Sequence, residues 1–203
     1  MPPPNLPLTG LVLAAGGSRR LGEPKQLLPY GPGPLLAHVL ETARECRFDQ
    51  LLCVLGGSAD AVRRQIDFDG VTVVENRSFG EGCSSSIAAA LSSVDPRSEG
   101  LILLLGDQPG VRAGTVAALV GGHGGATLAA CRYEDGRGHP LFFGRSMFAE
   151  LAEMHGDKAV WKLLERYAAQ VVDVPIAGPV PLDVDTWEDY RAVLAAAPAS
   201  LAS

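Results

Sequence analysis

The residues best suited to chemistry lie in a glycine-rich loop near the N-terminus. The loop spans ten residues and combines glycines with a hydroxyl and three cations, namely Gly16, Gly17, Ser18, Arg19, Arg20, Gly22 and Lys25. Three cations against the single Glu23 give these residues a net charge of +2, in a chain whose formal charge is -6. Glycines let backbone amides approach a ligand closely, and the cations supply countercharge. The loop therefore predicts a phosphate-binding site.

This loop fits neither of the two common phosphate-binding motifs. Gly17 and Gly22 have the spacing of a P-loop, but Glu23 stands where the lysine of that motif should follow. No G-x-G-x-x-G occurs in the segment, which disfavours a dinucleotide-dependent dehydrogenase. The alternative is a surface turn with solvated charges. We favour the phosphate site because the loop directly follows an apolar run, residues 11–14, and open α/β sheets bind ligands where strands end.

Carboxylates later in the chain are suited to complete such a site. Asp107 follows five consecutive aliphatic residues, 101–105, and a glycine, which places it at the carboxyl edge of a buried strand. Asp183 and Asp185 lie two apart in a short strand predicted over 182–185, so both should face one wall. Because Mg²⁺ favours one or two carboxylates with phosphate oxygens and water, Asp107 and Asp185 are predicted metal ligands. A turn-forming role for Asp107 and a surface position for Asp183 are the alternatives.

The elements that must position these groups alternate between strand and helix in the first half of the chain. Apolar runs predict strands over residues 11–14, 50–55, 71–75 and 101–105. Apolar faces at helical spacing predict helices over residues 34–46, 58–65, 84–93 and 113–120. The alternation predicts a three-layer α/β/α, Rossmann-like fold with a mostly parallel central sheet.

The regular alternation of strand and helix breaks near residue 126. Residues 126–180 are expected to add substrate-binding elements to the three-layer core. The pattern there predicts strands over residues 127–133, 138–143 and 171–174, with helices near 146–153 and 158–168. Thr186 and Asp189 have the spacing of a capping box and predict a last helix to about residue 197. Since no long linker interrupts the chain, residues 1–203 are expected to form a single domain.

Composition excludes several classes of protein. The chain has 203 residues, of which 47% are hydrophobic, and its pI is near 5.2, which argues against a nucleic-acid surface. The four cysteines form no C-x-x-C pair and do not cluster with histidines, so neither a zinc site nor a disulfide framework is predicted. The N-terminus lacks a signal-peptide pattern, and no window approaches a membrane span. We therefore expect a cytoplasmic protein that binds neither nucleic acid nor membrane.

Further candidate residues lie at 84–86, 139, 157 and 161. The serines at 84–86 should open a helix, either as an N-cap or beside amides that bind a ligand. His139 is either a substrate contact or a hydrogen-bonded structural histidine. Asp157, after a glycine, is expected to be a helix N-cap, and a pocket role is the alternative. Trp161 lies in a predicted helix, where packing is the favoured role.

The motifs together resemble the MobA-like nucleotidyltransferases, and most of all the branch of molybdenum cofactor cytidylyltransferases (MocA-like). The resemblance begins with LAAGGSRRLGEPK at 13–25 and extends over most of the chain. Further matching segments, in the same order, are EGCSSS at 81–86, GDQP at 106–109, GHP at 138–140, GD at 156–157 and DVDT at 183–186. Each match alone is weak, and their shared order makes the resemblance specific.

The resemblance implies a role for each matching residue. The nucleoside triphosphate would be held by Ala15, Gly16, Gly17, Ser18, Arg20 and Lys25, with Gly82, Ser84 and Ser85 near the base or ribose. Asp107 and Asp185 would bind Mg²⁺, and Lys25, Arg20 and Asp107 would be catalytic. His139 and Asp157 would lie on the side of the acceptor, a phosphorylated pterin in the family.

The resemblance implies transfer of a nucleotidyl group from CTP to a molybdopterin-type cofactor with release of pyrophosphate, and a molybdoenzyme as recipient. CTP is preferred to GTP because the first loop reads AAG at 14–16, not the AGG typical of the guanylyl branch. The segment GDKAVW at 156–161 departs from the usual G-D-x-G-A-R and leaves the acceptor open. The alternatives are a guanylyltransferase, another cofactor or sugar-phosphate nucleotidyltransferase, and a noncatalytic nucleotide-binding or cofactor-handover protein.

Overall fold

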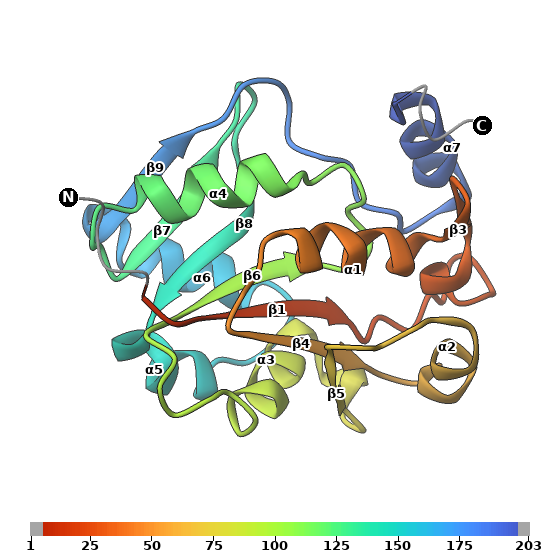
Figure 1. Ribbon diagram of the computed structural model, residues 1–203, viewed down its shortest axis with the longest axis horizontal. Coiled ribbons are helices and arrows are strands. Elements are labelled where there is room, and N and C mark those ends of the chain that lie inside the picture. The colour runs from red at the N-terminus through yellow and green to blue at the C-terminus, as the bar shows by residue number, and fades with distance from the viewer. Residues whose placement is uncertain (1–5, 199–203) are drawn as a thin grey trace.

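The computed structural model describes residues 6–198, and at its centre lies a mixed β-sheet (Figure 1). Within these residues the sheet has seven strands in the order β5-β4-β1-β6-β8-β7-β9. Their bounds are β1 Leu8–Ala14, β4 Gln50–Leu55, β5 Thr72–Glu75, β6 Gly100–Leu105, β7 Leu128–Arg132, β8 Arg137–Gly144 and β9 Val171–Pro175. Only β8 runs antiparallel to its neighbours, so the sheet is mostly parallel, as predicted.

Helices cover both faces of this sheet, which confirms the predicted three-layer fold (Figure 1). One face carries α1 (Leu35–Glu45) and α4 (Ala113–Gly122), and the other carries α3 (Cys83–Leu91), α5 (Phe148–Ala152) and α6 (Ala159–Arg166). The remaining elements are α2 (Ala59–Gln65), α7 (Trp187–Ala196), the short pair β2 (Pro29–Tyr30) and β3 (Gly33–Pro34), and 3-10 turns over Lys25–Leu27, Phe79–Glu81, Arg145–Met147 and Ala168–Gln170. No helix within the described range is long and apolar enough to cross a membrane.

Strand β1 shows why the central run is continuously apolar. Val12 and Ala14 point into the core under α1 and α4, whereas Leu11 and Leu13 point into the core over α3, α5 and α6. Because both faces are covered at residues 11–14, apolar side chains are favoured at each of these four positions. The run therefore ends where the sheet ends, and the polar loop begins beyond the carboxyl edge.

The predicted strand over 182–185 is absent, and so is a serine N-cap, one of the two readings of residues 84–86. Residues 182–185 form no strand, because the backbone N–H of Val184 bonds to the carbonyl of Asp107, in the loop after β6, and to no strand (3.1 Å). Helix α3 begins at Cys83 with Gly82 as its N-cap, and no serine side chain caps it. The capping box of Thr186 and Asp189 at the start of α7 is confirmed.

Candidate active site

The glycine-rich loop after β1 is held by its own hydrogen bonds. Ser18 adopts a left-handed backbone conformation (φ 48°), and its carbonyl accepts the N–H groups of Leu21 and Gly22 at 3.0 and 3.1 Å. The Ser18 hydroxyl accepts the backbone N–H of Lys25 at 3.0 Å. Gly22 has φ +78°, a conformation that L side chains rarely adopt. The loop thus folds back so that the Lys25 side chain lies beside the carboxyl edge of the sheet.

Two cations of the loop meet two carboxylates from distant parts of the chain. The Lys25 Nζ atom lies 2.5 Å from Asp107 Oδ2 and 2.8 Å from Asp185 Oδ1. Arg20 donates to the other oxygen of Asp185, also at 2.8 Å. The Lys25 and Asp107 side chains are 11% and 19% exposed, whereas Arg20 is 66% exposed. The structure therefore brings all four predicted residues together, with Lys25 between the carboxylates.

The surroundings shift the pKa values of Lys25, Asp107 and Asp185. Burial disfavours the Lys25 ammonium, but the neighbouring Asp107 and Asp185 outweigh it, so the pKa of Lys25 is raised. Burial raises the pKa of Asp107, although Lys25 opposes the shift. For Asp185 burial is outweighed by Lys25 and Arg20, and its pKa is lowered. Asp107 is therefore the carboxylate whose charge depends most on a cation close by.

The extended segment 181–185 is held against the loop after β6. Gln108, the residue after Asp107, donates from its amide nitrogen to Asp183 Oδ1 (2.8 Å) and to the carbonyl of Pro181 (3.1 Å). The Val184 side chain is fully buried, so Asp183 and Asp185 on either side of it both face the cleft. The predicted common wall of two carboxylates exists without the predicted strand.

The N-terminus of α3 meets the turn before α6. Asp157 Oδ1 accepts the backbone N–H of Cys83 at 3.1 Å. Gly82 has φ +101°, and a Cβ there would lie 2.7 Å from the same carboxylate oxygen, so only glycine fits. Helix α6 has Lys158 as its N-cap, with no side-chain cap. The prediction that Asp157 caps its own helix is therefore wrong, because its carboxylate binds the start of α3.

The serines of α3 are placed differently from the expectation. The Ser85 hydroxyl donates to the carbonyls of Ser78 and Gly82, and Ser84 is buried. Neither lines the cleft, whereas Cys83 and Ser86 do. The reason is helical geometry, since successive residues at a helix start point in different directions.

His139 and Trp161 form the part of the cleft next to β8. Their rings meet edge to face with centroids 5.5 Å apart, and the Tyr133 hydroxyl donates to the His139 carbonyl at 2.7 Å. His139 is buried, and burial lowers its pKa to about 4, so the ring is neutral at pH 7. Trp161 packs on the core, as predicted, and also lines the cleft.

The buried His139 predicts a loss of stability in mild acid. Its pKa is 6.5 when unperturbed and about 4 when folded, so the unfolded chain takes up the proton first and stability falls as pH decreases from 6.5 to 4. Between pH 7.5 and pH 5 this one group should cost about 2 kcal/mol. Urea unfolding at both pH values should show the loss in the wild type and not in His139→Gln. Equal losses of unfolding free energy in the two proteins would show that the His139 ring is not the group responsible.

The cleft at this edge has a volume of about 540 Å³. Of the residues singled out from the sequence, it is lined by Ala15, Gly16, Gly17, Ser18, Arg19, Arg20, Lys25, Gly82, Ser86, Asp107, His139, Asp157, Trp161, Asp183 and Asp185. Sequence reasoning missed Phe79, Cys83 and Val160, which also line it. The sequence does not indicate that Phe79 lines the cleft, because an apolar residue in a loop can pack on the core as well as face a ligand.

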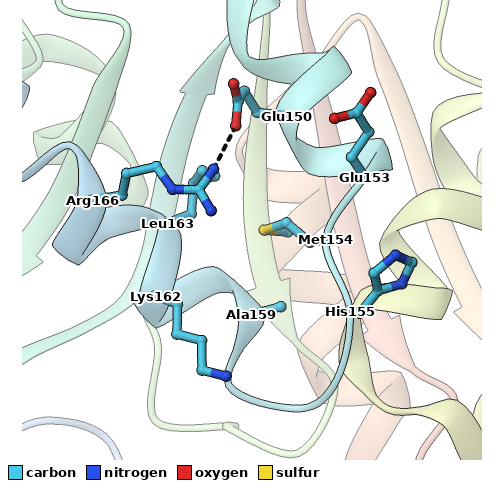
Figure 2. Close-up of a pocket in the computed structure, with 8 residues that line it drawn as sticks. All are labelled: Glu150, Glu153, Met154, His155, Ala159, Lys162, Leu163 and Arg166. Carbon is cyan, nitrogen blue, oxygen red and sulfur yellow. Dashed lines mark hydrogen bonds and ion pairs between the residues drawn. The ribbon is translucent and has the colours of Figure 1, made fainter.

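A second hollow, of about 290 Å³, lies between α5 and α6 (Figure 2). Figure 2 shows Arg166 reaching Glu150, with which it pairs at 3.1 Å. Lys162 extends from the same helix as Arg166, and His155 extends from the segment that joins α5 to α6. These side chains are exposed, and no sequence motif falls there. The residues that the sequence singles out as candidates for chemistry therefore lie mainly in the larger cleft.

Comparisons with known proteins agree with this geometry. The MobA-like NTP transferase domain matches residues 10–171. A homologue of Mycobacterium tuberculosis Rv0371c from Mycobacterium sp. strain JC1 is 50% identical, with a TM-score of 0.86 over 93% of this chain and 95% of that one. Rv0371c of M. tuberculosis H37Rv, in complex with manganese, is 45% identical, with a TM-score of 0.83 over 94% and 99%. Nicotine blue oxidoreductase of Paenarthrobacter nicotinovorans is 29% identical over 195 residues, covering 91% of this chain and 95% of that protein.

The matched residues hold the whole glycine-rich loop, Lys25, Asp107 and His139, and end at the start of β9. Since the match spans well over half of the chain, one conclusion follows. The chain belongs to the MobA-like NTP transferase family.

Proposed function

We propose that this protein transfers a nucleotidyl group from CTP to a phosphorylated pterin cofactor of the molybdopterin type, with Mg²⁺, in the cytoplasm, and that a molybdoenzyme receives the product. The observation that carries the proposal is the convergence of Lys25, Asp107 and Asp185 at the end of a glycine-rich loop. Cations and carboxylates side by side suit a metal-bound triphosphate, which needs both.

The phosphates are assigned to the β1 side of the cleft. Arg19, Arg20 and Lys25 all lie on the loop after β1, while the β8 side carries neutral His139 and Trp161. Negative phosphate groups bind where the positive charge is concentrated. The acceptor therefore binds on the β8 side, with Asp107 between the two substrates.

The carboxylates fit a hard divalent ion that arrives with the nucleotide. Asp107 and Asp185 offer oxygen donors, but the described residues contain no group of three His, Cys, Asp or Glu side chains arranged to hold a metal. Mg²⁺ is usually held by one or two carboxylates together with phosphate oxygens and water. The Mn²⁺ complex of the Rv0371c protein supports a divalent ion here. When bound, such an ion would neutralise charge on the phosphates.

The reaction needs position and charge more than covalent chemistry from the protein. A terminal phosphate oxygen of the acceptor attacks the α-phosphorus in line, the bond from the α-phosphorus to the bridging oxygen breaks, and pyrophosphate leaves. Lys25 and Arg20 stabilise the negative charge that develops on the phosphates. The glycine-rich loop fixes the triphosphate, and the β8 side orients the attacking group.

CTP and a pterin acceptor are supported by the resemblance of the motifs rather than by a contact. The test is pyrophosphate release with CTP, GTP, ATP and UTP, each with a pterin phosphate cofactor or a sugar phosphate as acceptor, with and without Mg²⁺. We expect the highest kcat/KM with CTP, Mg²⁺ and the pterin. Release with GTP or a sugar phosphate would identify a different transferase, and CTP binding without release would favour a noncatalytic handover protein.

A redox activity is the second candidate, because a relative aligned over nearly its full length is named nicotine blue oxidoreductase. Trp161 and His139 give the acceptor side an aromatic wall that suits a planar substrate. Oxidation of NADH or NADPH with a planar quinone-like acceptor, assayed beside pyrophosphate release, separates the two. Turnover only in the redox assay would replace the transferase proposal.

A further inference from the structure

Two buried glutamines share a feature that needs an explanation. Gln26 and Gln108 are each 3% exposed. Within residues 6–198, their amide oxygens are the buried side-chain polar atoms that lack a hydrogen-bond partner. Buried amides usually pair both the oxygen and the nitrogen, whereas the hydrogen bonds of these two side chains are all made by the nitrogen.

The Gln26 nitrogen serves the glycine-rich loop. It donates to the carbonyl of Ala14 at 2.7 Å and to the carbonyl of Gly16 at 3.1 Å. These carbonyls belong to the last residue of β1 and to the first glycine of the loop. Both amide hydrogens are thus donated to backbone carbonyls at the end of β1, where the predicted phosphate-binding loop begins.

The Gln108 nitrogen serves the carboxylate segment in the same way. Both of its hydrogens go to residues 181–183, at the Pro181 carbonyl and at Asp183 Oδ1. The preceding residue, Asp107, accepts the N–H of Val184. Adjacent residues therefore hold the segment by side chain and by backbone, which fixes Asp185 opposite the Asp107 carboxylate.

We propose that Gln26 and Gln108 are positioning residues for the two halves of the site. Gln26 sets the loop that binds the triphosphate, and Gln108 sets Asp183 and Asp185 against Asp107, where the divalent ion is held. This inference rests on the proposed nucleotide and metal binding. Because each amide donates to one half only, changing each should disturb one kind of binding and spare the other.

The test compares Gln26→Met and Gln108→Met, which keep the length of the side chain and remove the amide. Binding of α,β-methylene-CTP is measured by calorimetry, and binding of Mn²⁺ at saturating analogue by electron paramagnetic resonance. Gln26→Met should weaken the analogue tenfold or more and change Mn²⁺ affinity less than threefold. Gln108→Met should weaken Mn²⁺ tenfold or more, lower kcat and leave KM for the nucleotide within threefold.

Gln50→Met is the matched control. The Gln50 nitrogen donates to the Ser93 carbonyl at 2.7 Å, and the Gln50 oxygen accepts from the Thr9 hydroxyl and the Asp95 backbone N–H. Gln50 lies at the amino end of β4, outside the cleft. This variant should lower the unfolding temperature and move neither affinity. If all three variants shift both affinities together, or none shifts either, the glutamines are merely structural and the inference is wrong.

The outcome also distinguishes this inference from the proposed function. A wild-type chain that binds neither the analogue nor Mn²⁺ overturns the proposed function, and this inference with it. A wild-type chain that binds both, with variants that do not separate the two affinities, overturns this inference alone. If a methionine variant fails to fold, the side-chain NH₂ signals of the wild type are followed by NMR. The Gln26 pair should shift with the analogue alone, and the Gln108 pair should shift further when diamagnetic Mg²⁺ is added to the complex with the analogue. The reverse, equal shifts of both pairs at each step, or no response overturns the inference.

Discussion

Replacing Lys25 with methionine is expected to slow nucleotidyl transfer roughly 100-fold or more, because one charge-stabilising group in such a site contributes a few kcal/mol to the transition state. Lys25 is the loop cation that contacts both Asp107 and Asp185, and it lies on the glycine-rich loop proposed to bind the phosphates. The loss should appear in kcat/KM, measured by pyrophosphate release with saturating acceptor.

The same change should also affect stability. Removing one partner of a buried ion pair costs about 3–5 kcal/mol, since the remaining charge is left uncompensated. Without Lys25 the raised pKa of Asp107 should rise further, because burial then acts unopposed by that cation. A raised carboxyl pKa gives stability that is present at low pH and lost as pH rises through it. The variant should therefore lie closer to the wild type in urea at pH 5 than at pH 8.

Lys162→Met is the control for charge removal alone. Lys162 is exposed on α6 and lines the hollow of Figure 2, outside the larger cleft that holds Lys25. Its loss should leave both turnover and unfolding within experimental error of the wild type. If Lys25→Met retained turnover within threefold of the wild type, the role given to Lys25 would be wrong.

Asp107→Asn is expected to lower turnover by at least 100-fold while the chain remains folded. The amide keeps the size of the side chain and removes the carboxylate charge, and Lys25 keeps Asp185 as a partner at 2.8 Å. Because the cations of the loop remain, affinity for α,β-methylene-CTP should change much less than turnover. The concentration of Mn²⁺ or Mg²⁺ that gives half-maximal rate should rise, since a hard divalent ion prefers a charged oxygen donor.

Asp60→Asn is the matched control, because Asp60 is an exposed carboxylate in the first turn of α2. It should change neither rate nor metal dependence. An Asp107→Asn protein with normal turnover at normal metal concentration would show that Asp107 serves only as a partner for Lys25. In that case the catalytic assignment would have to move to Asp185, the other carboxylate that Lys25 contacts.

Much of the fold was predictable because its signals are local. A strand made only of aliphatic residues is stable where both faces of the sheet are covered. Residues 101–105 therefore predict a central strand without any knowledge of its neighbours. The glycines and cations of the loop also act locally, since backbone freedom and charge belong to the residues themselves. For this reason the phosphate-loop prediction needed no knowledge of the rest of the chain.

Pairings between distant segments were decided by the tertiary structure. Asp157 reads locally as a helix cap, yet it binds the amide of Cys83, 74 positions away. Segment 182–185 alternates like a strand, but the loop after β6 and not a strand receives its backbone bond. The sequence around Asp157 does not indicate Cys83 as its partner, and the sequence around residues 182–185 does not indicate Asp107.

The sequence by itself determined which groups are available and at which edge of the sheet they emerge. Only the tertiary structure decided that Lys25 lies between Asp107 and Asp185. It also decided that the Gln26 amide donates to the start of the glycine-rich loop and the Gln108 amide to segment 181–183. The physical reason is that the periodicity of apolar residues reports only on the local conformation of a short segment. Hydrogen bonds and ion pairs form between atoms that packing brings together, whatever their separation in sequence.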